Sequence, residues 1–256
     1  MSLSGLDASI LLPALAAGLL VLSTHVPLGR EVLARGILFI DLAVAQIAGL
    51  GVMLSHVLGW GERPWLLQGL AVVSALAGAL GLSWCERRWP EILEALIGVV
   101  FVLAASGGLL LLAGHPKGGE HLHDLLAGQI LWVSWEQLGW TLGLYLPMLG
   151  AWLFWPWLRQ GLGFYLLFAI AVTASVQLVG IYLVFASLIL PALASRRCGA
   201  RLGLVRAYAV GLTGYAIGLL LSALLDLPSG PMIVWALAAT AIVGSGLRNR
   251  QPAKPQ

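Results

Sequence analysis

Few polar side chains interrupt the long apolar runs of this chain, and three of them could do chemistry there: Asp41, Gln46 and Gln177. Placing an ionised carboxylate in lipid costs about 2.5–3.5 kcal/mol on insertion scales, so Asp41 must face a partner or a wet cavity. Gln46 follows five positions later, which we take as nearly the same helix face. Carboxylate and amide oxygens suit hard divalent cations better than they suit zinc. The set predicts either a cation route or hydrogen bonds between helices.

A second polar group lies in residues 114–124, the longest polar stretch. It contains His115, His121 and His123. Two of these, His121 and His123, could bind one metal ion only in an extended loop, and His-rich tracts alone are weak evidence for a metal site. Metal capture and a solvated surface loop both fit. We expect His25 and His56 to lie near helix ends, at the membrane interface.

Arginines follow the proline at position 191. Pro191 is succeeded by Arg196, Arg197, Arg201 and Arg206 within sixteen positions. A short basic segment of this kind is typical of a cytoplasmic loop under the positive-inside rule. It could equally be a docking segment for another protein.

Enzymatic chemistry finds little support. No Gly-rich Walker pattern followed by Lys and Ser or Thr occurs, so ATP hydrolysis would need a separate chain. Ser187 and Ser222 have no His or Lys at a plausible membrane depth. Cys85 and Cys198 lack metal-ligand spacing, and we expect both to be unpaired.

Composition sets the class. Hydrophobic residues make up 60% of the 256 positions and charged residues 10%, with a mean hydropathy of +0.94. Apolar runs of about 20 residues match the roughly 30 Å hydrocarbon core of a bilayer. The chain is predicted to be an all-α, polytopic integral membrane protein embedded in lipid. Its net charge of +3 comes from cations in short loops, which indicates membrane orientation rather than nucleic-acid binding.

The expected elements form one transmembrane domain, residues 1–247, followed by a disordered cytoplasmic tail, residues 248–256. An interfacial amphipathic stretch is expected at 125–138. The spans are predicted at 8–28, 32–58, 65–84, 92–113, 140–158, 164–194, 207–225 and 232–247. An arginine-rich segment, 195–206, connects the apolar segment 164–194 to the span at 207–225.

Residues 164–194 allow two interpretations. A straight helix of that length would reach about 45 Å, longer than the hydrocarbon core. Either it crosses once, tilted, or it breaks near Gln177–Gly180 and crosses twice. The first alternative gives eight spans and the second nine. Nine spans with the N-terminus outside leave two cations outside and twelve inside, which fits the positive-inside rule better.

Three stretches together resemble the membrane permease subunits of ABC-type zinc and manganese importers. Residues 179–192 read VGIYLVFASLILPA, residues 221–234 read LSALLDLPSGPMIV, and residues 94–101 read EALIGVVF. Their order and spacing follow the family pattern over nearly the whole chain. Each stretch alone would be a weak match.

The resemblance implies a permease that binds no cofactor and carries a divalent metal ion as substrate across the cytoplasmic membrane of a prokaryote. It also implies a homodimer, two ABC ATPase chains and an extracytoplasmic metal-binding protein. Pro191, Arg196, Arg197 and Arg201 would couple the permease to the ATPase. A cobalamin- or siderophore-type importer permease, or a polytopic membrane enzyme or assembly factor, are the alternatives.

The second span departs from the family. Members usually carry an Asp and a His there that line the metal path. Alignment on Gly51 places Leu42 at the Asp position and Gln46 at the His position, with Asp41 one residue early. One residue turns a helix by about 100°, so Asp41 leaves the expected face. The metal, zinc or manganese, is therefore open.

Overall fold

The computed structural model describes residues 8–61, 63–113, 119, 125–126 and 128–246, and over these residues the chain is helical, without strands. The long helices are α1 (Ala8–Arg35), α2 (Ile40–Val57), α3 (Pro64–Arg88), α4 (Leu93–Leu112), α6 (Trp135–Phe154), α7 (Gly161–Val179), α8 (Ile181–Ser195), α9 (Ala200–Leu225) and α10 (Ser229–Gly246). Short 3-10 turns, η2 (Pro90–Ile92), η3 (Ile130–Trp132) and η4 (Pro156–Arg159), connect some of them.

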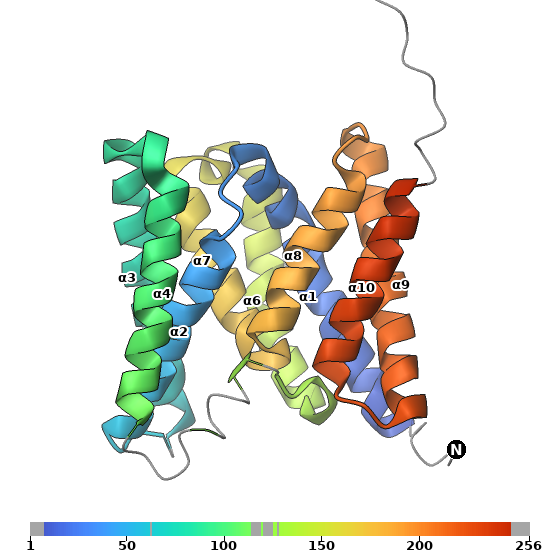
Figure 1. Cartoon of the computed structure of the whole chain (residues 1–256), viewed down its shortest axis with the longest axis horizontal. Coiled ribbons are helices and arrows are strands. Elements are labelled where there is room, and N and C mark those ends of the chain that lie inside the picture. Colours follow the sequence, from blue (N-terminus) through green and yellow to red (C-terminus); the bar gives the residue numbers. More distant parts are fainter. Residues whose placement is uncertain (1–7, 62, 114–118, 120–124, 127, 247–256) are drawn as a thin grey trace, which may run out of the picture.

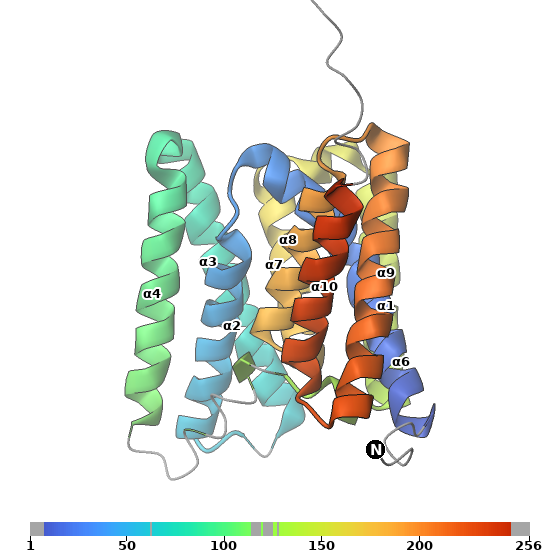
Figure 2. The ribbon, with the colours of Figure 1, turned by 45° about the vertical axis from the view of Figure 1, so that its right-hand side comes forward.

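Successive long helices run in opposite directions through one bundle (Figures 1 and 2). As a result, α1 begins at one end of the bundle and α10 ends at the other. This is the arrangement expected when residues 164–194 cross twice.

The long apolar segment is indeed broken, at Gly180. Helix α7 ends at Val179 and α8 begins at Ile181. Between them Gly180 has φ 81° and ψ 162°, a backbone conformation that is essentially restricted to glycine. The prediction of a break near Gln177–Gly180 is confirmed, and the single tilted helix is wrong.

The end of α1 differs from the prediction. We expected a helix at 8–28 and a second one from position 32, but α1 continues to Arg35 and α2 begins at Ile40. Gly29 lies inside α1, where it lets α8 approach closely: a Cβ at Gly29 would lie 2.1 Å from the carbonyl oxygen of Leu188. The chain turns instead at Gly36, where φ is +73°.

Two helices start at least five residues earlier than expected. Helix α9 begins at Ala200, so its first turns include residues that we had placed in a connecting segment before position 207. Helix α6 begins at Trp135, where the Ser134 and Gln137 side chains form a capping box. Such reciprocal caps satisfy backbone N–H groups that have no partner within the helix.

Six helical segments of the described chain are long and apolar enough to cross a membrane, and α8 and α10 are apolar but shorter. The six are α1, α2, α3, η2 with α4, α7 and α9. Whether the protein has eight or nine spans therefore stays a prediction.

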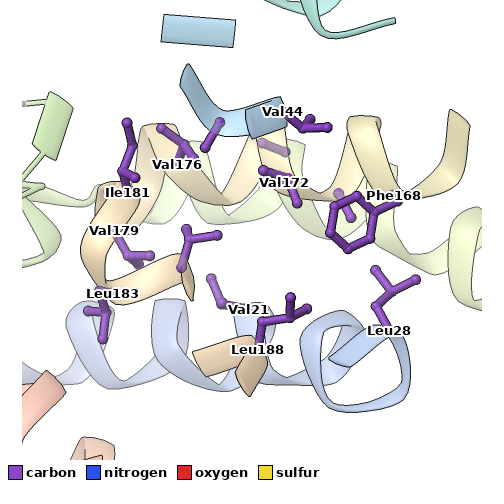
Figure 3. Close-up of a cluster of buried hydrophobic side chains, with 14 of the residues drawn as sticks. Val21, Leu28, Val44, Phe168, Val172, Val176, Val179, Ile181, Leu183 and Leu188 are labelled. Atoms are coloured by element: carbon purple, nitrogen blue, oxygen red, sulfur yellow. The ribbon is translucent and has the colours of Figure 1, made fainter. Parts of the chain in front are cut away.

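The core lies where α1, α2, α7 and α8 meet (Figure 3). Val21 and Leu28 of α1 face Leu188 of α8, while Phe168 and Val172 of α7 cover the opposite side. Helix α8 is buried along most of its length. It packs against α1, α2, α7, α9 and α10.

The bundle end where α1 finishes is tied together by Arg35. Its guanidinium lies 2.9 Å from Glu31 and 3.9 Å from Glu86 of α3. It also donates a hydrogen bond to the carbonyl oxygen of Arg159 and stacks 4.1 Å from the ring centroid of Phe164. The ends of α1 and α3, η4 and the start of α7 are thus held as one block.

Candidate functional site

The basic segment forms the junction between α8 and α9. Pro191 is buried within α8, whereas Arg196 and Arg197 are exposed just beyond its last residue. Arg201 is exposed in the first turn of α9. The junction lies at the same end of the bundle as the end of α1 (Figure 1). Of the predicted coupling residues, the three arginines are therefore accessible at this end, and Pro191 is not.

Helix α1 supports this junction directly. Arg30 donates a hydrogen bond of 2.9 Å to the carbonyl oxygen of Ala200, the first residue of α9. A Cβ at Gly203 would lie 2.5 Å from the Arg30 guanidinium, so the glycine leaves room for it. The junction is therefore braced against α1 through Arg30.

The second candidate region is a cavity of about 700 Å³ between α2, α4, α8 and α10, here called the central cavity. Leu42 and Gln46 of α2 lie on its wall. Among the described residues of the wall, the polar side chains are those of Gln46, Tyr182 and Trp235, and none of them is charged. A smaller cavity of about 600 Å³ shares Leu42 and Phe101 with it and extends it along α2 and α4.

Asp41 does not belong to the walls of these two cavities. It is fully buried, and within the described chain neither carboxylate oxygen has a hydrogen-bond partner. It sits in the first turn of α2, not deep in a longer helix as predicted. Unpaired backbone N–H groups at a helix start favour a negative charge, whereas burial without hydrogen bonds disfavours it.

The expectation that Asp41 and Gln46 share a helix face is wrong. Five residues correspond to about 500°, which leaves the two side chains about 140° apart. Four residues leave only about 40°, which is why Leu42 lines the cavity together with Gln46. The two positions where the family resemblance places an Asp and a His thus face the central cavity, but they carry Leu and Gln.

The remaining predicted residues are not brought to this cavity. Gln177 is exposed on α7, next to an otherwise buried stretch, and does not line the central cavity. His115, His121 and His123 lie outside the described residues. Across the described part of the chain, no group of three or more His, Cys, Asp or Glu side chains could hold a metal ion.

A set of buried polar contacts was not predicted. His25 lies inside α1, fully buried, with Nδ1 3.0 Å from the carbonyl oxygen of Val21, which corrects its expected interfacial place. Tyr145 hydrogen-bonds the Ser175 hydroxyl, linking α6 to α7. Small hydroxyl residues within apolar helices were the available sign, since such residues commonly bond across membrane helices.

The same kind of contact joins α8 to α9. The hydroxyl groups of Ser187 and Tyr215 lie 2.8 Å apart in the buried interior. A Cβ at Gly18 would lie 2.3 Å from the Tyr215 ring, so α1 also fits against this tyrosine. Helices α1, α8 and α9 therefore pack as a unit beneath the basic junction.

Comparison with known proteins agrees with this architecture. A manganese transport system membrane protein, MntC of Halalkalibacterium halodurans, is 28% identical over 251 residues, covering 90% of this chain and 84% of the relative. PsaBC from Streptococcus pneumoniae, solved with a Fab, has a TM-score of 0.74 at 21% identity, covering 92% of this chain and 90% of the other.

A second solved structure is an inward-facing ABC transporter described as of the metal-chelate type. It has a TM-score of 0.66 at 18% identity and covers 92% of this chain and 83% of the other. At these identities the two structures establish the fold alone. The family match is broader: residues 7–158 and 156–247 match the ABC 3 transport family, and the chain belongs to that family of multi-pass membrane permeases.

Proposed function

We propose that this chain is the permease subunit of an ATP-driven importer for a divalent transition metal ion, manganese or zinc. The observation that carries the proposal is family membership over residues 7–247, together with a curated relative named for manganese transport. In this proposal the metal ion is cargo, and the chain itself hydrolyses no ATP.

The partners follow from the same proposal. Two copies of the chain would surround a central route, two ATPase chains would bind on the cytoplasmic side, and an extracytoplasmic protein would deliver the metal. The host membrane would be the cytoplasmic membrane of a prokaryote. His115, His121 and His123 remain candidates for capturing metal at the outer side, and Gln177 and Asp41 remain candidates for the route.

The basic junction would receive the motion of the ATPase. Pro191 lies in the buried helix α8, while Arg196 and Arg197 project at its end. Because Arg30 braces α9 and Arg35 ties α1 to α3 and α7, displacement of the junction would spread to most of the bundle. This continuity supports a coupling role over a simple positive-inside anchor.

The test is metal uptake in cells that lack their own manganese and zinc importers. Cells expressing the permease with its ATPase and binding protein should accumulate radiolabelled manganese or zinc. Replacing Arg196 and Arg197 by Glu should abolish uptake while the permease stays folded in the membrane. The matched control makes the same exchange, Arg to Glu, at Arg87 and Arg88, two exposed arginines at the end of α3. This control variant should transport normally.

The outcomes separate the two parts of the proposal. If cells that express the wild-type permease with its ATPase and binding protein take up neither metal, the importer proposal is refuted. Uptake that survives the Arg196 and Arg197 exchange at the level of the Arg87 and Arg88 control would refute coupling and restore the simple anchor.

A second candidate cargo is a metal chelate. The part of the central cavity's wall that the structure describes offers amide, phenol and indole groups but no carboxylate, imidazole or thiolate, and transition metals stripped of water need such ligands. In a metal chelate the organic molecule already supplies the metal's ligands, and its apolar groups would contact Leu42. Uptake of labelled chelate that excess free metal does not inhibit would favour this cargo, and complete inhibition would exclude it.

A further inference from the structure

Helix α1 contains a proline, Pro27, well inside its length. Proline has no backbone N–H, so it cannot donate the hydrogen bond that the carbonyl oxygen of Ser23, four residues earlier, would otherwise accept. Another helix supplies the missing donor: the hydroxyl group of Tyr208, on α9, donates a hydrogen bond of 3.1 Å to the Ser23 carbonyl oxygen. The bond that α1 lacks is thus replaced from α9.

The turn of α1 before this proline is weak for a second reason. Its polar side chains bond to carbonyl oxygens of their own helix: Ser23 Oγ donates to the carbonyl oxygen of Leu20 at 2.6 Å, and Thr24 Oγ1 donates to that of Val21 at 3.2 Å. Side-chain bonds of this kind compete with the backbone hydrogen bonds and often bend a helix. Helix α1 is therefore bent most easily here, which is where the Tyr208 hydroxyl binds.

Lipid offers no substitute for this hydrogen bond. Tyr208 lies eight residues after the first residue of α9, about 12 Å along a helix that is apolar enough to cross a membrane. Without water, a carbonyl group freed by proline in a membrane helix must be satisfied by a neighbouring helix. Close packing brings the tyrosine into place, because a Cβ at Gly211 would lie 2.6 Å from the Leu22 side chain of α1.

The weak turn divides α1 into two parts with different surroundings. The part after Pro27 meets the basic junction: Arg30 donates a hydrogen bond to the carbonyl oxygen of Ala200, and a Cβ at Gly29 would lie 2.1 Å from the carbonyl oxygen of Leu188 in α8. The part before Pro27 continues to the opposite end of the bundle (Figure 1). Displacement of the junction reaches that opposite end through α1 only if the helix does not bend in between.

We propose that Tyr208 is a positioning residue for coupling. By binding the Ser23 carbonyl oxygen it stiffens α1 at Pro27, so that displacement of the basic junction is carried along the whole helix. The inference rests on the proposed function, in which the ATPase displaces this junction, and it assigns Tyr208 no contact with the metal ion. Without the hydroxyl group, α1 would bend at Pro27 and part of each displacement would be lost.

A double-mutant cycle tests the hydrogen bond without any transport. Tyr208→Phe should raise the equilibrium constant for unfolding in SDS micelles about threefold, the average effect of one hydrogen bond between membrane helices. In Pro27→Ala the new N–H of residue 27 can donate to Ser23, so Tyr208→Phe should have little effect in that background. The matched control is Thr213→Val, also on α9, because the Thr213 hydroxyl donates to the carbonyl oxygen of Ala209 in the same helix. This control should have the same effect in both backgrounds. An equal effect of Tyr208→Phe with and without Pro27 would overturn the proposal.

Coupling is measured in proteoliposomes that contain the permease with its ATPase, supplied with the binding protein, ATP and radiolabelled manganese or zinc. The readout is the amount of metal transported per ATP hydrolysed. This ratio should fall about threefold in Tyr208→Phe and return to the wild-type value when Pro27→Ala is added, because α1 without this proline needs no external donor. A purely structural tyrosine would lower the amount of folded protein and leave the ratio unchanged. Pro13→Ala, at the other proline inside α1, should not restore the ratio.

The outcomes separate this inference from the proposed function. If wild-type proteoliposomes transport neither metal, the importer is refuted, and the coupling role of Tyr208 with it. If wild type transports and Tyr208→Phe keeps the wild-type ratio, only the role of Tyr208 is refuted. A lowered ratio that Pro27→Ala does not restore, or that Pro13→Ala restores equally well, would also refute that role.

Discussion

Replacing Gly180 by Ala should destabilise the protein. Gly180 reverses the chain between α7 and α8 with φ 81° and ψ 162°. Forcing a side chain into this glycine-only region costs about 1–3 kcal/mol. The surroundings cannot relax easily, because a Cβ at the neighbouring Gly128 would already lie 2.1 Å from the carbonyl oxygen of Val179. The unfolding equilibrium constant should therefore rise by about 5- to 150-fold.

The alternative of one continuous helix predicts the opposite sign. Within an unbroken helix, Gly180→Ala would remove a flexible residue and stabilise by about 0.5–1 kcal/mol. Reversible unfolding in mixed micelles with increasing SDS measures the difference. Gly143→Ala is the matched control, because Gly143 lies within α6 with nothing within 4 Å of its Cβ position. That control should be stabilised, and a Gly180→Ala protein equally stabilised would refute the reversal.

Substitutions at three further positions probe the buried residues. Asp41→Asn should reduce metal uptake strongly if the carboxylate lines the metal route. Near-normal uptake by Asp41→Asn, together with less folded protein in Asp41→Leu, would show that Asp41 stabilises the fold instead. Gly29→Ala should lower the thermal unfolding midpoint and the yield of folded protein, because its Cβ position lies 2.1 Å from the carbonyl oxygen of Leu188; an unchanged midpoint would contradict this packing. Tyr215→Phe should cost only about 0.6 kcal/mol, the average for hydrogen bonds between membrane helices, since Ser187 keeps its bond to its own helix; a several-fold larger loss by SDS unfolding would show that the contact does more than bridge α8 and α9.

The sequence predicted the helical membrane fold because long apolar runs leave few alternatives in lipid. It also offered the break near Gly180 as one of two interpretations, because an apolar segment of 31 residues is too long for one straight span. The predicted end of the first helix, before Gly29, was wrong for a physical reason. A single sequence does not distinguish a glycine that ends a helix from a glycine that lets two helices pack closely. Only the contact with Leu188 separates the two cases.

The candidate site was harder to predict than the fold. Asp41 drew attention because an acid in an apolar run is unusual, yet the residue that faces the central cavity is its neighbour Leu42. Which side of a helix faces a cavity depends on the packing of every surrounding helix, and residue type alone does not fix it. The pairs Tyr145–Ser175 and Ser187–Tyr215 involve partners 30 and 28 positions apart, beyond any local pattern.

The wall of the central cavity limits where an importer of this design can select its cargo. A zinc ion favours imidazole, thiolate or carboxylate ligands, and Gln46 offers one amide oxygen beside Leu42. A manganese ion accepts oxygen ligands including water, so it could pass this wall while keeping most of its hydration shell. Under the proposed function, the permease would then carry hydrated manganese more readily than dehydrated zinc, and the delivering protein would provide most of the selectivity.

Replacing Leu42 by Asp and Gln46 by His should shift uptake towards zinc, because the two side chains, about 40° apart on one face, would supply the missing ligands. An unchanged ratio of zinc to manganese uptake would show that the cargo does not contact this wall.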